Sequence, residues 1–248
     1  MRCRTRTMKS TTTLSTHEMS RDPTRVVRRS LVLAAIVCRG DLDNGASQPE
    51  AVALYDRLLK WLTQFDLWRE AEPSEEKILR TPLGKLEKEQ AIRAVWHAEG
   101  LAVLVWALKQ SEFPRHDQKV DPYSAADAVW FLREDVEELI RSAGLRKPMQ
   151  LKASREILYA IHARLRDFIC YRERKDFTGW IERRWVDTLQ LDAAHLIVDD
   201  DIAIDGQPIN KVEYDRVQEC ASIANERHKA IIWLVERYPS YSQTPVDT

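Results

Sequence analysis

Apolar positions recur with helical spacing along most of this chain, and the strongest such pattern covers residues 90–108. One face of this stretch carries apolar side chains at i, i+3 and i+4 spacing, namely Ile92, Val95, Trp96, Ala102, Val103 and Trp106. From residue 101 to residue 108 the stretch is apolar on every side, which is typical of a helix enclosed by other elements. The pattern therefore predicts a buried central helix.

Capping signals predict where further helices begin. Asp22 and Pro23 suit the N-cap and first position of a helix that ends near Gly40. Two capping boxes, Ser47–Glu50 and Asn210–Glu213, predict the starts of a second helix and of a last helix over about 211–237. Additional helices are expected after Ser74, after Asp121, over 134–142 and over 154–174.

One segment carries a β signal. Asp205-Gly206 separates two short apolar runs, and this dipeptide is the strongest local hairpin signal because glycine readily adopts positive φ. Pro208 would place its strand at a sheet edge. The expected fold class is therefore mainly α, a multi-helix globular bundle around a buried central helix, with one small β-hairpin near residues 196–209.

The composition predicts the domain organisation. Residues 1–20 are rich in Arg, Thr and Ser and hold one acidic residue, so we expect a disordered N-terminal tail. Residues 21–238 are expected to form a single helical domain, and residues 239–248 an irregular C-terminal tail. The seven glycines are few, which favours helix; the mid-helix Gly100 predicts that another backbone packs close to it.

Charge and cysteine content indicate the cellular compartment and the kinds of partner that we expect. The net charge of −1 gives no bulk attraction to nucleic acid or anionic membranes. The four cysteines form no C-x-x-C pair and read as reduced thiols, and no apolar run reaches the roughly 18 residues of a membrane span. We therefore expect a cytoplasmic protein without membrane contact. The apolar run Leu31–Cys38 is similar to a signal peptide, but no A-x-A site follows it.

Glu99 is the sharpest chemical anomaly, because it lies within the apolar stripe of the central helix. A buried carboxylate needs a cationic or hydrogen-bonding partner, or it takes up a proton. The favoured hypothesis is a structural ion pair with Arg29 or Arg227. The alternative is a polar pocket in which Glu99 acts as a general acid or base beside Trp96 and His228.

No cofactor and no metal are expected. The six histidines lack H-E-x-x-H or similar spacing, and no G-x-G-x-x-G or Walker A loop occurs. His97-Ala98-Glu99 is similar to the H-x-E of zinc deaminases, but the P-C-x-x-C partner motif is missing. Asp199–Asp201 fits no register of a calcium-binding EF-hand loop, so a solvated turn is favoured.

Residues 164–184 combine basic and aromatic side chains, a composition that can bind RNA by stacking and charge. The aromatic residues in and next to this stretch are Phe168, Tyr171, Phe177, Trp180 and Trp185. The same composition describes a helix end and a loop whose aromatic residues cap the core. We favour that interpretation and do not expect nucleic-acid binding.

An ordered series of segments resembles the bacterial domain-of-unknown-function family four-two-seven-two, over roughly residues 22–248. The segments are Arg29-Ser30-Leu31, residues 90–108, residues 202–209, residues 226–234 and the terminal Val246-Asp247-Thr248. The resemblance implies one continuous domain. It supplies no catalytic residue.

Two functions are compatible with these observations, and whether the protein is an enzyme is left open. The first is a non-catalytic protein-interaction module, since no catalytic or cofactor motif is present. The alternative is an enzyme or small-ligand-binding protein with a polar pocket at Glu99. A closed, fully paired Glu99 beside an exposed apolar patch would favour the first, and a solvent-connected polar cavity the second.

Overall fold

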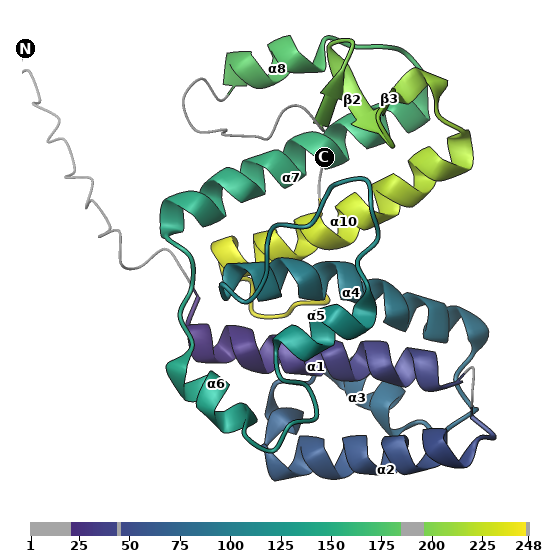
Figure 1. Ribbon diagram of the computed structural model, residues 1–248, viewed down its shortest axis with the longest axis vertical. Helices are drawn as coiled ribbons and strands as arrows, with labels where there is room; N and C mark the ends of the chain where they lie inside the picture. Colours follow the sequence, from purple (N-terminus) through teal and green to yellow (C-terminus); the bar gives the residue numbers. More distant parts are fainter. Residues whose placement is uncertain (1–20, 44–45, 185–195, 247–248) are drawn as a thin grey trace, which may run out of the picture.

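The computed structural model describes residues 21–43, 46–184 and 196–246, and shows a mainly helical protein, as predicted (Figure 1). The N-terminal tail expected over residues 1–20 lies outside the described residues. Within the described part, the α-helices are α1 (Pro23–Leu42), α2 (Pro49–Gln64), α3 (Pro73–Arg80), α4 (Lys88–Ala107), α5 (Pro122–Ala128), α6 (Val136–Ser142), α7 (Pro148–Tyr171), α8 (Phe177–Arg184) and α10 (Tyr214–Glu236). Two short 3-10 helices, η3 (Leu67–Arg69) and η4 (Ile209–Lys211), complete the helical part.

The helix α4 is the centre of the packing, as its sequence predicts. It lies between α1 on one side and α10 on the other, and α7 covers the far side of α10 (Figure 1). Every residue from Ala98 to Ala107 is buried. A helix enclosed in this way cannot have a solvated polar face, so any charge on it must be matched by a neighbouring element.

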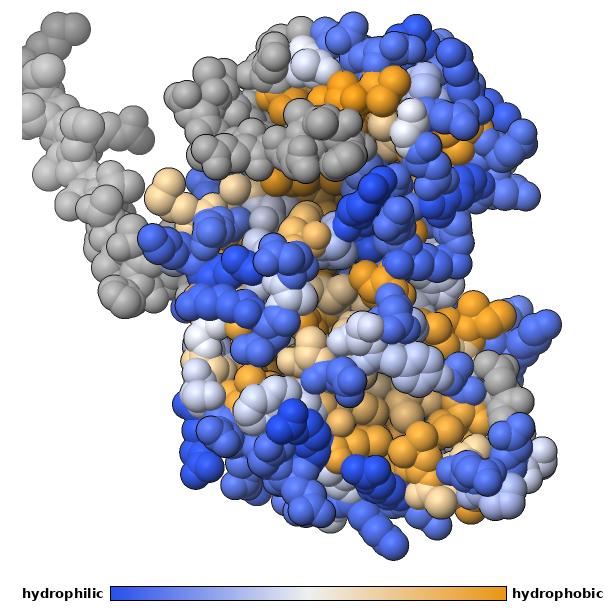
Figure 2. All heavy atoms as spheres, in the orientation of Figure 1, coloured by the Kyte–Doolittle hydropathy of each residue, from blue (hydrophilic) through white to orange (hydrophobic). Residues whose placement is uncertain are grey.

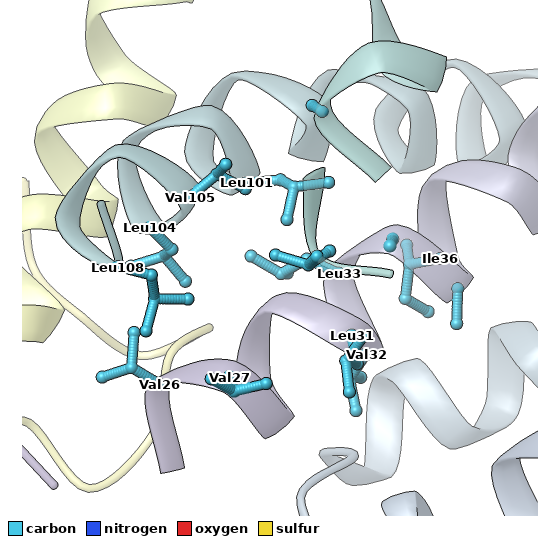
Figure 3. Packing of buried hydrophobic residues seen from close by; sticks show 14 of the residues in the cluster. Val26, Val27, Leu31, Val32, Leu33, Ile36, Leu101, Leu104, Val105 and Leu108 are labelled. Carbon is cyan, nitrogen blue, oxygen red and sulfur yellow. The ribbon is translucent and has the colours of Figure 1, made fainter. Parts of the chain in front are cut away.

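The main hydrophobic core forms where α1 meets α4. Leu33 and Ile36 of α1 and Leu101 and Leu104 of α4 belong to one buried cluster, and Figure 3 shows these side chains in the space between the two helices. The helix α1 is buried without a break from Ser30 to Val37. The two most apolar segments of the chain therefore cover one another.

A second hydrophobic cluster joins α7 to the small sheet. Leu165 of α7 and Ile202 and Ile204 of the sheet are fully buried in it. The helix α10 contributes to both clusters, with Val217 in the second and Trp233 in the first. It therefore connects the two halves of the described structure.

The predicted β-hairpin is present and has one more strand. β1 (Ile197–Val198), β2 (Asp201–Ile204) and β3 (Gln207–Pro208) form an antiparallel sheet in that order. Asp205 and Gly206 turn between β2 and β3 with φ of 52° and 74°, the positive values that the Asp-Gly signal predicts. Pro208 pairs with Ala203 from the edge strand β3, as expected.

Two predicted helix starts are wrong. Pro49 occupies the first turn of α2 and Gln48 is its N-cap, so Ser47 does not cap the helix. Ahead of α10, residues 209–211 form the 3-10 helix η4, which places Ile209 in the core. The helix α10 consequently begins at Tyr214 with Glu213 as N-cap, and Asn210 is not its cap.

The structure differs from the prediction at Gly40 and agrees with it at Gly100, where the backbone carbonyl oxygen of Glu226 lies 3.5 Å from a Cβ placed on the glycine. Gly40 was expected to end the first helix but lies inside α1, where a Cβ would come within 2.7 Å of the Ala91 carbonyl oxygen. Glycine at this position therefore lets α1 and α4 approach closely. At Gly100 the nearest atom to such a Cβ is a side-chain atom, the hydroxyl oxygen of Tyr241, at 2.1 Å.

Tyr241 belongs to a C-terminal segment that packs back onto the helices. Its side chain is fully buried and meets the ring of Trp233 edge-on, with ring centroids 5.7 Å apart. The backbone N–H groups of Tyr241 and Ser242 donate to the carboxylate of Glu72, and Arg25 donates to the Pro239 carbonyl at 2.8 Å. The expected irregular tail is thus held in place over the residues that the structure describes.

We predict that Gly100→Ala lowers the free energy of unfolding by about 1–3 kcal/mol, although alanine is the better helix former. The added methyl group would overlap the hydroxyl of Tyr241, whose buried ring has no room to move. Urea denaturation measures the effect. In a Tyr241→Phe background the same substitution should cost less, and a stabilising Gly100→Ala in the wild type would contradict this packing.

Candidate functional site

A buried ion pair connects α4 to α10. The Arg227 Nε and Nη2 atoms donate to Glu99 Oε2 at 2.9 and 2.7 Å. The side chains of Arg227 and Glu99 are only 1% and 4% exposed, so water contributes little to their solvation. Of the two arginines expected as partners, the structure therefore selects Arg227.

The pair also fixes the segment that follows α4. The second carboxylate oxygen of Glu99 accepts the backbone N–H of Val120 at 3.1 Å. Arg227 donates further to the carbonyl oxygens of Arg115 and of Gln118, the latter at 2.7 Å. Burial raises the pKa of Glu99, although Arg227 and the Val120 N–H oppose that shift. The carboxylate is thus fully partnered, as a structural ion pair requires.

The remaining predicted site residues lie in separate environments. Arg29 donates to Glu75 Oε2 at 2.6 Å and ties α1 to the start of α3. His228 contacts His162 of α7, with their Nδ1 atoms 3.3 Å apart. Trp96 is half-buried on α4, and Lys119 Nζ lies 5.0 Å from its ring centroid. Of the proposed pocket residues, Arg227 contacts Glu99 and Trp96 lines the same cavity as Glu99, whereas Arg29 and His228 lie with other partners.

Burial suppresses protonation of the two contacting histidines. It lowers the pKa of His162 to about 4 and that of His228 to about 3. Both side chains are neutral at physiological pH. They are core residues between α7 and α10, and the Tyr159 ring packs edge-on against His228.

A cavity of about 550 Å³ opens between the end of α1 and the first half of α4. Glu99 and Trp96 form part of its wall, but most of the lining is apolar or small. Its principal apolar lining residues are Leu86, Ala91, Ile92, Val95, Ala98, Val120 and Pro122. The cavity is therefore suited to an apolar group more than to a charged substrate.

Exposed hydrophobic side chains stand at this cavity. Ile92 lines it and is 49% exposed. Tyr123 is 70% exposed, and its hydroxyl lies 2.5 Å from Oδ2 of Asp41, another lining residue. The sequence reasoning missed Tyr123 and Lys119, because their places at the cavity depend on the path of the loop after α4. One indication of this surface in the sequence was the hydrophobic Ile92 near the start of the central helix, close to polar residues.

The basic and aromatic stretch near residue 170 contributes mainly to the second core cluster. Phe168 and Phe177 are buried there, and Arg164 donates to both carboxylate oxygens of Asp201 at 2.7 Å. These contacts support the core interpretation of the stretch. Trp185 lies outside the described residues.

The described residues offer neither a metal site nor a membrane-spanning helix. They contain no group of three or more His, Cys, Asp or Glu side chains that could hold a metal ion. Nor does any described helix combine the length and the apolar character that a membrane crossing requires.

Comparison with known proteins gives one family. The family described as Domain of unknown function (DUF4272) matches residues 9–178, the part of the chain from before α1 into α8. The resemblance noted in the sequence extends further, to the C-terminus, whereas this match ends before the sheet and α10. No curated protein and no solved structure matches the chain.

We predict that Glu99→Gln lowers the free energy of unfolding by about 2–4 kcal/mol, because it leaves the buried Arg227 charge uncompensated. The double variant with Arg227→Met should lose less than the sum of the single changes. Urea denaturation measures all three. Glu76→Gln, which breaks an ion pair whose side chains are 58% and 45% exposed, is the control and should change stability by less than about 1 kcal/mol. An unchanged stability in Glu99→Gln would contradict the structural role.

We predict that acid destabilises the fold through His162 and His228. Their folded-state pKa values of about 4 and 3 lie below the value of about 6.5 in the unfolded chain. The unfolded state therefore binds more protons, and stability falls as pH decreases from about 6.5 towards 4, by up to about 1.4 kcal/mol per pH unit and histidine. His228→Leu should flatten this dependence between neutral pH and pH of about 5. Histidine ring NMR signals that titrate with an ordinary pKa at both positions would disprove the assignment.

Proposed function

Because the chain belongs to the family described as Domain of unknown function (DUF4272), whose name assigns no activity, we propose a function from the geometry alone. The protein is a non-catalytic module that binds another protein, and its binding surface is the cavity between α1 and α4. The observation that supports this most is the exposed Ile92 in the lining of the cavity, together with the exposed Tyr123, whose hydroxyl donates to the lining residue Asp41.

Large hydrophobic side chains are seldom exposed on this molecule. Those exposed among the described residues are Val52, Ile92, Tyr123, Met149 and Tyr171. Of these five, Ile92 lines the cavity together with the half-buried Trp96, and Tyr123 is hydrogen-bonded to the lining residue Asp41. Figure 2 shows that hydrophobic side chains also gather on this half of the molecule, over α1 and α2, among hydrophilic ones. A cluster of this kind, rimmed by polar groups, is typical of a protein-binding surface.

The residues that line the cavity indicate which side chains of a partner would fit it. An apolar side chain of the partner would enter the cavity, where it would replace water next to aliphatic groups. Asp41 and the lysines Lys88 and Lys119 lie at the same cavity, and charges at the margin of an interface set orientation and association rate more than affinity. The partner is thus a protein segment with an apolar anchor flanked by charges of both signs.

The alternative, an enzyme or small-ligand protein with its site at Glu99, has less support. Arg227 and Val120 already occupy both oxygens of the Glu99 carboxylate. His228 and Arg29 have other partners, so neither of these two residues is positioned to share a proton with Glu99. Nucleic acid is not the proposed partner, because the cavity lining combines the two lysines with three acidic residues, Asp41, Asp43 and Glu99.

Site-specific photocrosslinking tests the proposal. The photoreactive residue p-benzoylphenylalanine is placed at Tyr123 in the full chain, expressed in its native cells. We expect a discrete adduct with one other protein after irradiation. Ile92→Asp should reduce the adduct about tenfold, because losing a central apolar contact costs on the order of 1.4 kcal/mol or more of binding energy.

Tyr171 provides a matched control, since it is 68% exposed and lies on α7, away from the cavity. The same crosslinker at Tyr171 should not give the adduct. The proposal fails if Tyr123 gives no discrete adduct, if Tyr171 gives the same adduct in equal yield, or if Ile92→Asp has no effect.

A further inference from the structure

A second hollow of about 600 Å³ lies on the opposite side of Trp96, between α4 and α10. We call it the α4–α10 groove. Its lining is mostly polar, in contrast to that of the first cavity. The residues that bear its chemistry are Arg93, Trp96 and His97 of α4 and Asn225, Glu226 and Lys229 of α10.

His97 and Glu226 face one another in this groove. His97 Nδ1 lies 3.6 Å from Glu226 Oε2, and neither atom has a hydrogen-bond partner among the described residues. Both atoms are buried, while the side chains as a whole are 22% and 18% exposed. A ligand in the groove therefore reaches the imidazole through Nε2, since its other nitrogen is turned to the carboxylate. Asn225 Nδ2 donates to the remaining Glu226 oxygen at 3.3 Å.

The Glu226 carboxylate remains charged behind the imidazole. Burial disfavours its charge, but His97 and Lys229 outweigh that effect and lower the pKa of Glu226. A neutral imidazole that carries its proton on Nε2 donates a hydrogen bond from that nitrogen. His97 can thus donate a hydrogen bond into the groove.

Two cationic side chains accompany this imidazole. Lys229 lines the groove, with Nζ 5.2 Å from the centroid of the buried Tyr241 ring. Arg93 lines it from α4, and its ion pair with Glu89 at 3.5 Å is largely exposed, at 71% and 86%. Such an exposed pair contributes little free energy, so Arg93 is free to exchange Glu89 for another anion.

We infer that the α4–α10 groove binds a small molecule through an anionic oxygen group, a carboxylate or a phosphate. Lys229 and Arg93 supply positive charge, and His97 Nε2 donates a hydrogen bond to the anionic oxygens. The volume suits one small molecule more than a polymer. This inference goes beyond the proposed protein-binding surface and uses different residues, apart from the shared Trp96.

Histidine NMR provides the test. Potassium phosphate and potassium acetate are the probes, each titrated at constant pH and constant ionic strength with chloride as the balancing ion. The ring Cε1–H signal of His97 is assigned by its loss in His97→Gln. We expect at least one probe to shift this signal saturably while the signals of buried His162 and His228 stay in place. Which probe does so distinguishes a carboxylate ligand from a phosphate ligand.

Three single-residue variants test whether the shift of the His97 signal reports binding in the α4–α10 groove. Lys229→Gln and Arg93→Gln should each weaken the saturable shift about tenfold, because each removes a charge-assisted contact. Lys211→Gln, which removes an exposed lysine outside the groove, should leave it unchanged. Arg93 is exposed, so its variant retains the fold even if Lys229→Gln loosens the packing of Tyr241. A shift that never saturates, or one that both groove variants leave unchanged, would overturn the inference.

Discussion

The enclosure of α4 is the constraint on which the rest of this structure depends. From Ala98 to Ala107 every residue of the helix is buried, yet the helix carries the carboxylate of Glu99. Arg227 meets this charge from α10 and uses its remaining donors to hold the carbonyl groups of the loop after α4. One ion pair thus sets the register of two helices and the path of the segment that forms the wall of the apolar cavity.

Features that depend on local patterns could be predicted from the sequence. The periodicity of residues 90–108 indicates the central helix, and Asp205-Gly206 indicates the hairpin, because each signal acts through its immediate neighbours. The first residues of two helices were predicted incorrectly. At Gln48 a following proline determines the cap, and at Asn210 the burial of Ile209 imposes a 3-10 turn, so tertiary packing overrides the capping box.

The site was only partly accessible from the sequence, because its contacts join distant segments. The need of Glu99 for a cationic partner follows from burial alone. The choice between Arg29 and Arg227 does not, since both are buried arginines on predicted helices, and only the fold places Arg29 beside the acidic start of α3. The residues of the apolar cavity converge through a loop, which no periodicity describes.

The two hollows share a common wall. Trp96 lines both the apolar cavity and the α4–α10 groove, and the neighbouring polar residues of α4 divide between buried and accessible settings. His97 faces Glu226 in the groove, while Glu99 is paired with Arg227 in the interior. Successive residues of α10, Glu226 and Arg227, thus meet α4 positions that are two apart, one in the accessible groove and one in a buried structural pair.

The long separation between α4 and α10 along the chain also affects how the protein is made. Glu99 and Arg227 are 128 residues apart, so α1 and α4 leave the ribosome well before their covering helix is synthesised. Before residues 227–241 are synthesised, the side of α4 that α10 covers is exposed to solvent, and the Glu99 carboxylate lacks its partner Arg227. The apolar segments made first therefore gain their full burial only when the last helix and the segment after it have been synthesised.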